Sequence, residues 1–431
     1  MEEKEIVTYC IDSLQKLGVQ KAHCILQNRE KNELNVESNN VNLLRTTYDT
    51  NLHMVAIIDQ RKGSISLNKI DKESIDEAID MVIAIAKVSE ADSANDIAEK
   101  QTSKEFDLGD KNPDLDNMYD KLKEFLQYAN EKYPKTILEQ VILDFTKAKS
   151  YIQNSNGIDF ISRRGINHFS AMFTSKDGEK TSSFNHSGFS ARKLDKPIKD
   201  FGSIDRLLKQ SSEQINSRSF TDKIIGDVLV TPDCLGDFIS AITRNFLSDY
   251  SLITENSIYK DKLNKSIADP KLTLHSKPIS EEIANGYFIT GDGYEVQNST
   301  IIEKGILKTF LLSLYGSKKT GRAKAVNDGG AYIIDPGDES LEDIINSIQK
   351  GILLCRFSGG NPSENGDFSG VVKNSYFIES GEIQYPLKET MISGNLAQMF
   401  NNIKNISKER VDFGGAIFPW IHFSGLTISG K

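Results

Sequence analysis

Histidine and cysteine side chains are the groups in this sequence that could hold a catalytic metal ion. A hydrolytic zinc site of the helical type needs two imidazoles on one helix face and a third ligand elsewhere, and no H-x-x-x-H pair occurs. The spacing therefore predicts no metal site, and we expect each imidazole to be satisfied locally. The six histidines are His23, His53, His168, His186, His275 and His422.

The four cysteines are equally scattered and form no C-x-x-C pair. Free thiols in this pattern are typical of a reduced, cytoplasmic protein, in which cysteine behaves as a small buried hydrophobe. No G-x-S-x-G motif marks an activated serine. Local motifs thus indicate no catalytic centre, and we predict a cytoplasmic location. The cysteines are Cys10, Cys24, Cys234 and Cys355.

Three polar, glycine-containing segments deserve comparison with ligand-binding loops. Residues 316–321 have the glycine spacing of a phosphate-binding loop, but Arg322 and Ala323 follow where Lys and Ser or Thr are needed, so we expect a basic loop. Residues 361–367 lack the closing glutamate of a calcium loop. The longer run 356–370 predicts a flexible loop, which either lines a binding site or is an ordinary connection.

Composition excludes several classes of function. The 431 residues include 52 Lys and Arg against 61 Asp and Glu, a net charge of −9. This charge disfavours direct binding to the phosphates of nucleic acid. No run of apolar residues is long enough to span a membrane, and the acidic first residues do not read as a signal peptide. We expect neither nucleic acid nor membrane as a direct partner.

Apolar periodicity predicts the elements that would position these side chains. Helical spacing predicts helices over residues 72–89 and 341–352, and a further helix that begins at Pro232. Residues 136–192 read as successive strands, and residues 90–112 as a polar connection. Strands cluster apart from helices, which indicates an α+β protein of two domains, each with a largely antiparallel sheet and a few helices.

The same pattern predicts where the domains divide. Residues 1–192 form the amino-terminal α+β domain, and residues 193–225 form a charged, helical connector. Residues 226–431 are rich in glycine and short strands, and form the second domain.

Six segments of the second half carry a likeness to a known family: residues 291–293, 302–307, 356–370, 376–383, 393–395 and 418–430. They resemble the TldD/PmbA family, also called modulators of DNA gyrase, and within it the PmbA or TldE branch. The order of elements in the first half is similar to that family as well. The resemblance implies a two-domain α+β protein that dimerises and belongs to a cytosolic peptide-degrading system.

In the family, the TldD branch carries an HExxxH helix and a later cysteine that hold a metal. The corresponding helix here places Ser240, Ala241 and Asn245 at the positions of those motif residues. No histidine lies between His186 and His275. Ser240 cannot replace an imidazole ligand, and Ala241 has no carboxylate to act as a general base. The resemblance therefore implies a branch without the metal motif, with no catalytic residue and no metal ligand in this chain.

The function implied is that of a non-catalytic, metal-free subunit of a TldD/TldE-type cytosolic metalloprotease, which degrades or processes unfolded peptides. The chain alone is expected to be inactive, with zinc only in a TldD-like partner. The alternative is a homodimeric peptide-binding or gyrase-modulator-like regulator without a protease partner. A third alternative is an independent hydrolase with an unrecognised centre.

We expect the polar run to contribute to the cavity that holds the peptide. Extended peptides commonly add to exposed sheet edges through main-chain hydrogen bonds, and this chain is rich in strands. The residues expected to line the cavity are Arg356, Ser358, Gly359, Asn361, Asp367 and Ser369.

Overall fold

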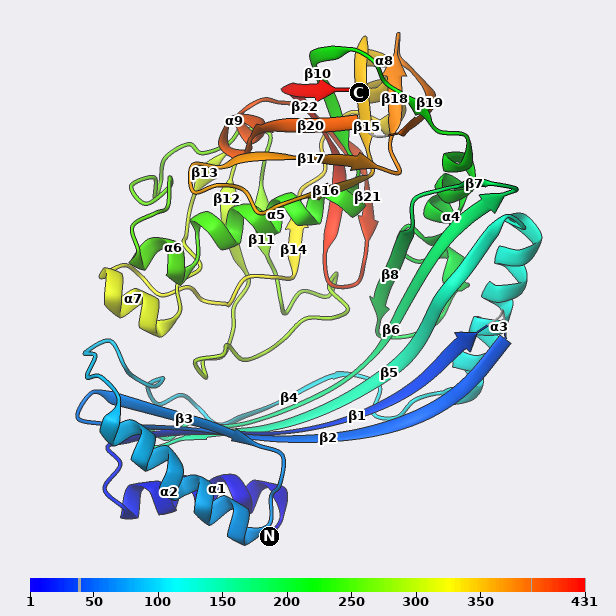
Figure 1. Ribbon diagram of the computed structural model, residues 1–431. Helices are drawn as coiled ribbons and strands as arrows, with labels where there is room; N and C mark the ends of the chain where they lie inside the picture. The colour runs from blue at the N-terminus through cyan, green and yellow to red at the C-terminus, as the bar shows by residue number, and fades with distance from the viewer. Residues whose placement is uncertain (38–39, 389, 431) are drawn as a thin grey trace.

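Two large, mainly antiparallel sheets, one in each of two domains, form the framework of the protein (Figure 1). The structure, a computed structural model, describes residues 1–37, 40–388 and 390–430. Helices cover parts of both sheets, so the expected α+β class is confirmed. None of the helices in these residues is long and apolar enough to cross a membrane.

The first sheet has the strand order β3-β2-β1-β5-β6-β4, and β8 pairs with β6 beyond the end of β4. The predicted run of strands over residues 136–192 is confirmed. The segment expected to be a polar connection contains the strand β4, so that prediction is wrong for residues 104–109. β4 pairs in parallel with β6, and it buries only one aromatic side chain, Phe106. The strands are β1 (Lys21–Glu37), β2 (Asn40–Ile58), β3 (Arg61–Leu67), β4 (Lys104–Gly109), β5 (Thr136–Asn154), β6 (Asp159–Asp177), β7 (Lys180–Thr181) and β8 (Asn185–Ala191).

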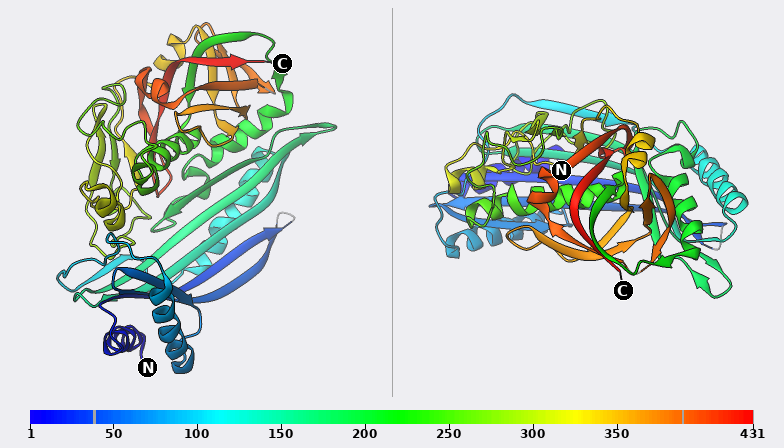
Figure 2. Two further views of the ribbon diagram at one scale, coloured as in Figure 1. Left: turned by 60° about the vertical axis from the view of Figure 1, so that its left-hand side comes forward. Right: turned by 90° about the horizontal axis from the view of Figure 1, so that it is seen from above.

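Three helices cover the convex face of this sheet: α1 (Glu3–Lys16), α2 (Lys72–Val88) and α3 (Leu115–Lys132). The side chains of Asp71 and Asp114 cap α2 and α3 by accepting backbone N–H bonds. The helix predicted over residues 72–89 is confirmed, because its apolar face is periodic and complete. The second domain lies against the opposite, concave face (Figures 1 and 2).

The segment between the sheets holds η1 (Ile198–Asp200), α4 (Ile204–Glu213), η2 (Gln214–Asn216) and β9 (Arg218–Ser219). Leu207 and Leu208 of α4 are buried in the hydrophobic core of the first domain, beside Phe189. α4 thereby joins the edge of the first sheet to the start of the second.

The second sheet is organised around β22, which pairs with β10, β14, β20 and β21. Its strands are β10 (Lys223–Val230), β11 (Leu274–Ser276), β12 (Ser299–Glu303), β13 (Ile306–Leu307), β14 (Tyr332–Ile334), β15 (Lys350–Leu354), β16 (Arg356–Gly359), β17 (Asp367–Lys373), β18 (Tyr376–Glu379), β19 (Glu382–Lys388), β20 (Thr390–Asn395), β21 (Ile403–Asp412) and β22 (Ile417–Ser429). The helices are α5 (Pro232–Phe246), α6 (Asp249–Ile253), α7 (Leu314–Thr320), α8 (Leu341–Ser347) and α9 (Leu396–Asn401).

Three local predictions in this domain are wrong. Residues 316–321 belong to α7, which the Ser313 side chain caps and which ends at Gly321 in the left-handed conformation, rather than to a loop. The helix expected to reach residue 352 ends at Ser347, since the apolar residues that follow it form the buried strand β15. Residues 356–370 form the β16–β17 hairpin, whose strands pair from Arg356↔Lys373 to Gly359↔Gly370.

A packed junction joins the domains at the end of the first sheet near α2. The Asp92 carboxylate accepts hydrogen bonds from Tyr315 Oη at 2.8 Å and Lys319 Nζ at 3.0 Å. Gln101 Nε2 donates to the carbonyl oxygen of Gly293 at 3.2 Å. The imidazole of His23 is 5% exposed and lies against this glycine. Contrary to expectation, neither of its nitrogens has a hydrogen-bond partner among residues 1–37, 40–388 and 390–430. We call this the closed junction.

Candidate functional site

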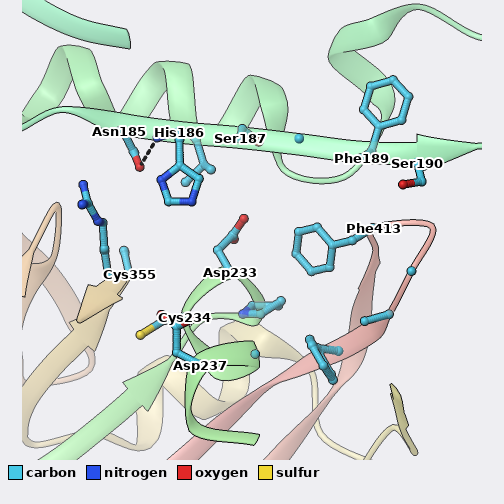
Figure 3. A pocket seen from close by; sticks show the side chains of 18 of the residues that line it. Asn185, His186, Ser187, Phe189, Ser190, Asp233, Cys234, Asp237, Cys355 and Phe413 are labelled. Carbon is cyan, nitrogen blue, oxygen red and sulfur yellow. Dashed lines mark hydrogen bonds between the residues drawn. The ribbon is translucent and has the colours of Figure 1, made fainter. Parts of the chain in front are cut away.

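A cavity of about 570 Å³ lies where the outer edge of β8 faces the start of α5 (Figure 3). Both domains line it. The first domain contributes β8 and His168, and the second contributes the starts of α5 and β16 and the turn between β21 and β22. We call this cavity the cleft.

The outer edge of β8 is fixed at both ends and open between them. At one end, the Phe184 carbonyl oxygen accepts from Arg356 Nη1 at 2.6 Å and from Asn374 Nδ2 at 3.1 Å. At the other, the Ser190 N–H donates to the Phe413 carbonyl oxygen at 2.9 Å. Backbone groups alternate between the edges of a strand, so those of His186 and Gly188 also point outward. Gly188 has no backbone partner on this side within the described part of the chain.

Two buried polar side chains line this edge without completing their hydrogen bonds. Asn185 is 4% exposed and Ser187 is 6% exposed. Asn185 Oδ1 accepts from the His186 N–H at 3.0 Å, but Asn185 Nδ2 and Ser187 Oγ have no partner in the described part of the chain. Buried polar groups are ordinarily paired, and leaving one unpaired costs about 1 to 3 kcal/mol. The edge therefore offers unused hydrogen-bonding capacity to a molecule in the cleft.

The first turn of α5 brings two carboxylates to the opposite wall. Asp233 accepts from Arg206 Nη2 at 2.6 Å and from Ser203 Oγ at 3.0 Å. Asp237, one helical turn later, has no hydrogen bond or ion pair among the described residues. Burial raises the pKa of the Asp237 carboxyl, and the nearby charges of His186 and Arg356 partly oppose this shift. Asp237 is thus the carboxylate that is free to meet a ligand.

Cys234 and Cys355 also line the cleft, and both are buried. Burial raises the pKa of each thiol well above its ordinary value, so both remain protonated at neutral pH. A protonated thiol is a poor nucleophile and a poor metal ligand. The cysteines of the cleft therefore provide no activated nucleophile.

A second cavity, of about 270 Å³, lies farther along α5 and shares Asp237 with the cleft. The apolar stripe of α5 is buried in the domain core, which leaves its polar face toward the two cavities. This arrangement brings together five residues singled out from the sequence: Ser240, Ala241, Asn245, Gly359 and Asn361.

The remaining residues singled out from the sequence are placed differently. Arg356 lines the cleft, with its guanidinium 3.9 Å from the centre of the Phe184 ring. Ser358 and Ser369 are exposed on the β16–β17 hairpin and line neither cavity. Asp367 accepts from Asn395 Nδ2 at 2.9 Å and fixes the turn of the hairpin instead of facing a cavity.

Comparison with known proteins finds proteins that are similar to this chain. Residues 223–430 match the family model described as the PmbA/TldA metallopeptidase C-terminal domain. A relative named "Metalloprotease PmbA homolog", from Haemophilus influenzae, is 25% identical over 393 residues, which cover 84% of this chain and 82% of that protein. The carboxy-terminal half of the chain is therefore similar to the C-terminal domain of this family, and most of the chain is similar to a PmbA homologue.

Two further proteins are similar to this chain over different lengths. A "Zinc metalloprotease TldD homolog" from Saccharolobus solfataricus is 32% identical over 200 residues, 43% of this chain and 44% of that protein. The crystal structure of TldE from Thermococcus kodakarensis superimposes with a TM-score of 0.84 at 19% identity, and the match covers 99% of this chain and 100% of that one. The fold is therefore shared over the whole chain.

The metal implied by the family name does not fit the residues of this α5. Ser240, Ala241 and Asn245 supply no imidazole and no carboxylate, whereas a hydrolytic zinc ion needs nitrogen, sulfur or carboxylate ligands. In residues 1–37, 40–388 and 390–430, no three His, Cys, Asp or Glu side chains gather in a way that could hold a metal ion. We therefore derive no chemical step through a metal in this chain.

Sequence reasoning missed the β8 wall of the cleft. Asn185, His186 and Ser187 carry no motif, and their closeness to α5 depends on how the two domains pack. Asp237 was within reach of the sequence, because it lies one turn from both Asp233 and Ser240 on the polar face of the predicted helix.

Proposed function

We propose that this chain is a non-catalytic subunit of a TldD/TldE-type cytoplasmic metalloprotease. It pairs with a TldD-like chain that carries the zinc, and it helps to hold an unfolded peptide in extended form. The observation that carries the proposal is the α5 face: it lines two adjoining cavities, yet it presents Ser240, Ala241 and Asn245 where zinc ligands and a general base would be needed.

The open edge of β8 supports the peptide part of the proposal. An extended segment placed beside Gly188 would take up the outward backbone groups of this strand as an added strand. Main-chain pairing of this kind is independent of side-chain identity, which suits unfolded peptides of varied sequence. Asn185 Nδ2 and Ser187 Oγ would complete their hydrogen bonds on the same segment.

The charged groups of the cleft support binding instead of hydrolysis. Asp237 and Arg356 stand on the wall opposite β8 and offer one negative and one positive group to peptide side chains or termini. Asp233 is already neutralised by Arg206. With both thiols protonated, the cleft is equipped to orient a peptide but not to attack its carbonyl carbon.

The test combines metal analysis with a peptidase assay of this chain alone, of a TldD-like partner alone, and of their mixture. We expect no stoichiometric zinc and no cleavage with this chain alone, and faster cleavage in the mixture than with the partner alone. Chelator-resistant cleavage by the purified chain, or tightly bound zinc in it, would refute the proposal. A homodimer that neither binds the partner nor changes its rate would favour a regulator instead.

A matched pair of variants tests the role of β8 in the mixture. Ser187→Ala removes an unpartnered hydroxyl in the cleft, and we expect it to raise the KM for peptide severalfold without weakening the complex. Ser358→Ala removes an exposed hydroxyl that lines neither cavity, and its KM should equal that of the wild type. Equal KM values for all three proteins would show that β8 does not contact the peptide.

A further inference from the structure

A third cavity, of about 500 Å³, lies on the concave face of the first sheet and shares His168 with the cleft. Arg29 and Lys31 of β1, Asp144 of β5 and Arg164 of β6 line it, together with Asn285 of the second domain. The cavity is therefore predominantly basic, although the whole chain has a net charge of −9. Nothing in the proposed function uses these side chains.

Strand register places the two arginines in one row. Arg29 pairs with Ala148 of β5, and Ala148 pairs in turn with Arg164. Residues in one cross-strand row project from the same face, so both guanidiniums stand over the concave side with the small Ala148 between them. The row thus leaves space between two planar, positively charged groups.

Neither arginine has a carboxylate partner. Lys31 pairs with Glu33 and lies 3.4 Å from Asp144, so the local acids are already used. Arg29 makes no hydrogen bond or ion pair within the described residues. Among the residues that the structure describes, Arg164 donates only to the neutral Asn285 Oδ1, and its buried Nε has no partner.

The missing partner has an electrostatic cost. Arg164 is half-buried, and its withdrawal from water and the positive charge of Arg29 both lower its pKa. An anion between the two guanidiniums would remove this repulsion and complete the hydrogen bonds. Planar guanidinium groups bind carboxylates with two parallel N–H···O bonds, which makes a carboxylate the best match to the site.

We propose that Arg29 and Arg164 bind the terminal carboxylate of a peptide whose preceding residues lie along β8. This inference rests on the proposed function, because it requires that this chain binds a peptide along β8. His168 belongs to both cavities, and its Nδ1 is hydrogen-bonded to Ser190 Oγ of β8 at 2.9 Å. A volume of about 500 Å³ accommodates the last one or two residues of a peptide.

The test compares fluorescent octapeptides of one sequence that end in a free carboxylate or in a carboxamide. We expect the acid to bind this chain about tenfold more tightly than the amide, a difference of about 1.4 kcal/mol. In Arg29→Gln, the acid should bind only as tightly as the amide, while binding of the amide is unchanged. Arg29 makes no hydrogen bond or ion pair within the described residues that the substitution would remove, so the variant should unfold at or slightly above the wild-type temperature.

Lys31→Gln is the matched control, because Lys31 lines the same cavity but is already paired with Glu33 and Asp144. It should retain most of the preference for the acid. A preference that survives Arg29→Gln, or equal binding of acid and amide to the wild type, would overturn this inference and leave the proposed function standing. Binding of neither peptide would refute peptide capture by this chain as well.

Two further binding measurements distinguish a terminal carboxylate from a side-chain carboxylate and from a free small carboxylate. An amide peptide with an internal glutamate should bind like the plain amide, and equal affinity with the acid would overturn the terminal assignment in favour of a side chain. Acetate alone should displace the acid peptide only at high concentration. Displacement by acetate at submillimolar concentration would assign the site to a free small carboxylate and overturn the peptide assignment.

Discussion

Two of the places where the domains meet, the closed junction and the cleft, differ in how the domains contact each other. The closed junction packs His23 against Gly293 and pairs Asp92 with Lys319, so direct contacts join the domains there. The cleft keeps about 570 Å³ open between β8 and α5. The contacts of the closed junction and those at the two ends of β8 together position the domains around the cleft. A rigid support of this kind positions binding groups without the ligand's help.

The largest effect on the closed junction should come from pH. Burial lowers the pKa of His23 to about 4, whereas an unfolded histidine titrates near 6.5. As the pH falls from 6.5 toward 4, the unfolded chain binds a proton that the folded chain does not, and stability is lost. The shift corresponds to a loss on the order of 3 kcal/mol in the free energy of unfolding. Denaturant titrations across this pH range measure the slope.

A His23→Leu variant isolates this contribution, because leucine cannot bind a proton. The free energy of unfolding of His23→Leu should vary much less between pH 6.5 and 4 than that of the wild type. His53→Gln, at a half-buried histidine hydrogen-bonded to Ser66 Oγ at 2.9 Å, should keep most of the wild-type slope. An unchanged slope in His23→Leu would show that the closed junction is not the acid-sensitive element.

A smaller effect separates the two carboxylates of the cleft. Asp233→Ala leaves the Arg206 guanidinium without its ion pair, and we expect a loss of about 2 kcal/mol in the free energy of unfolding. Asp237→Asn breaks no pair. The pKa of Asp237 is raised in the folded protein, so its ionisation costs stability as the pH rises above about 4. The free energy of unfolding of Asp237→Asn should therefore increase relative to that of the wild type between about pH 4 and 7.

Thermal and denaturant unfolding at both pH values distinguish these variants. If Asp237→Asn destabilises the protein as much as Asp233→Ala does, Asp237 has a structural role and the contrast between paired and free carboxylate fails.

The smallest effect tests the fit of the closed junction. Gly293 has a φ of +92°, and a Cβ built on it would lie 3.1 Å from His23 Cε1. Gly293→Ala should therefore cost about 1 to 2 kcal/mol in the free energy of unfolding, since an L residue is strained in this conformation. Gly360→Ala is the matched control, because a Cβ there meets nothing within 4 Å. Equal stability of the two variants would mean that the closed junction tolerates a displacement of Gly293 relative to His23.

The fold was predictable where one face of an element is repeatedly apolar. α2 and α5 carry Ile, Val, Leu and Phe at helical spacing over several turns, and both were found near their predicted bounds. β4 was missed because it has only Phe106 buried. Residues 348–352 were assigned to a helix because Ile348 and Ile352 continue the helical spacing of α8, whereas pairing with β10 places the end of this segment in β15.

The site was predictable only as far as it is local. Ser240, Ala241 and Asn245 share one helix face, and Gly359 and Asn361 lie on the adjacent hairpin, so family resemblance and periodicity found them together. Ser187 and Arg29 belong to the other domain, and their surroundings depend on strand pairing across more than a hundred residues. No pattern within a single segment of the sequence predicts which residues this pairing brings together.

The central place of β22 has a consequence for synthesis on the ribosome. β10 pairs with Ile421–Ser429 through most of its length, so a nascent chain that has already emerged as far as α5 must wait about two hundred residues for this neighbour. During that interval at least one edge of a hydrophobic strand stays unprotected, which is the condition under which incomplete sheets associate wrongly. We therefore expect the second domain to depend on chaperones during translation more than the first, whose long strands pair mostly with their close successors.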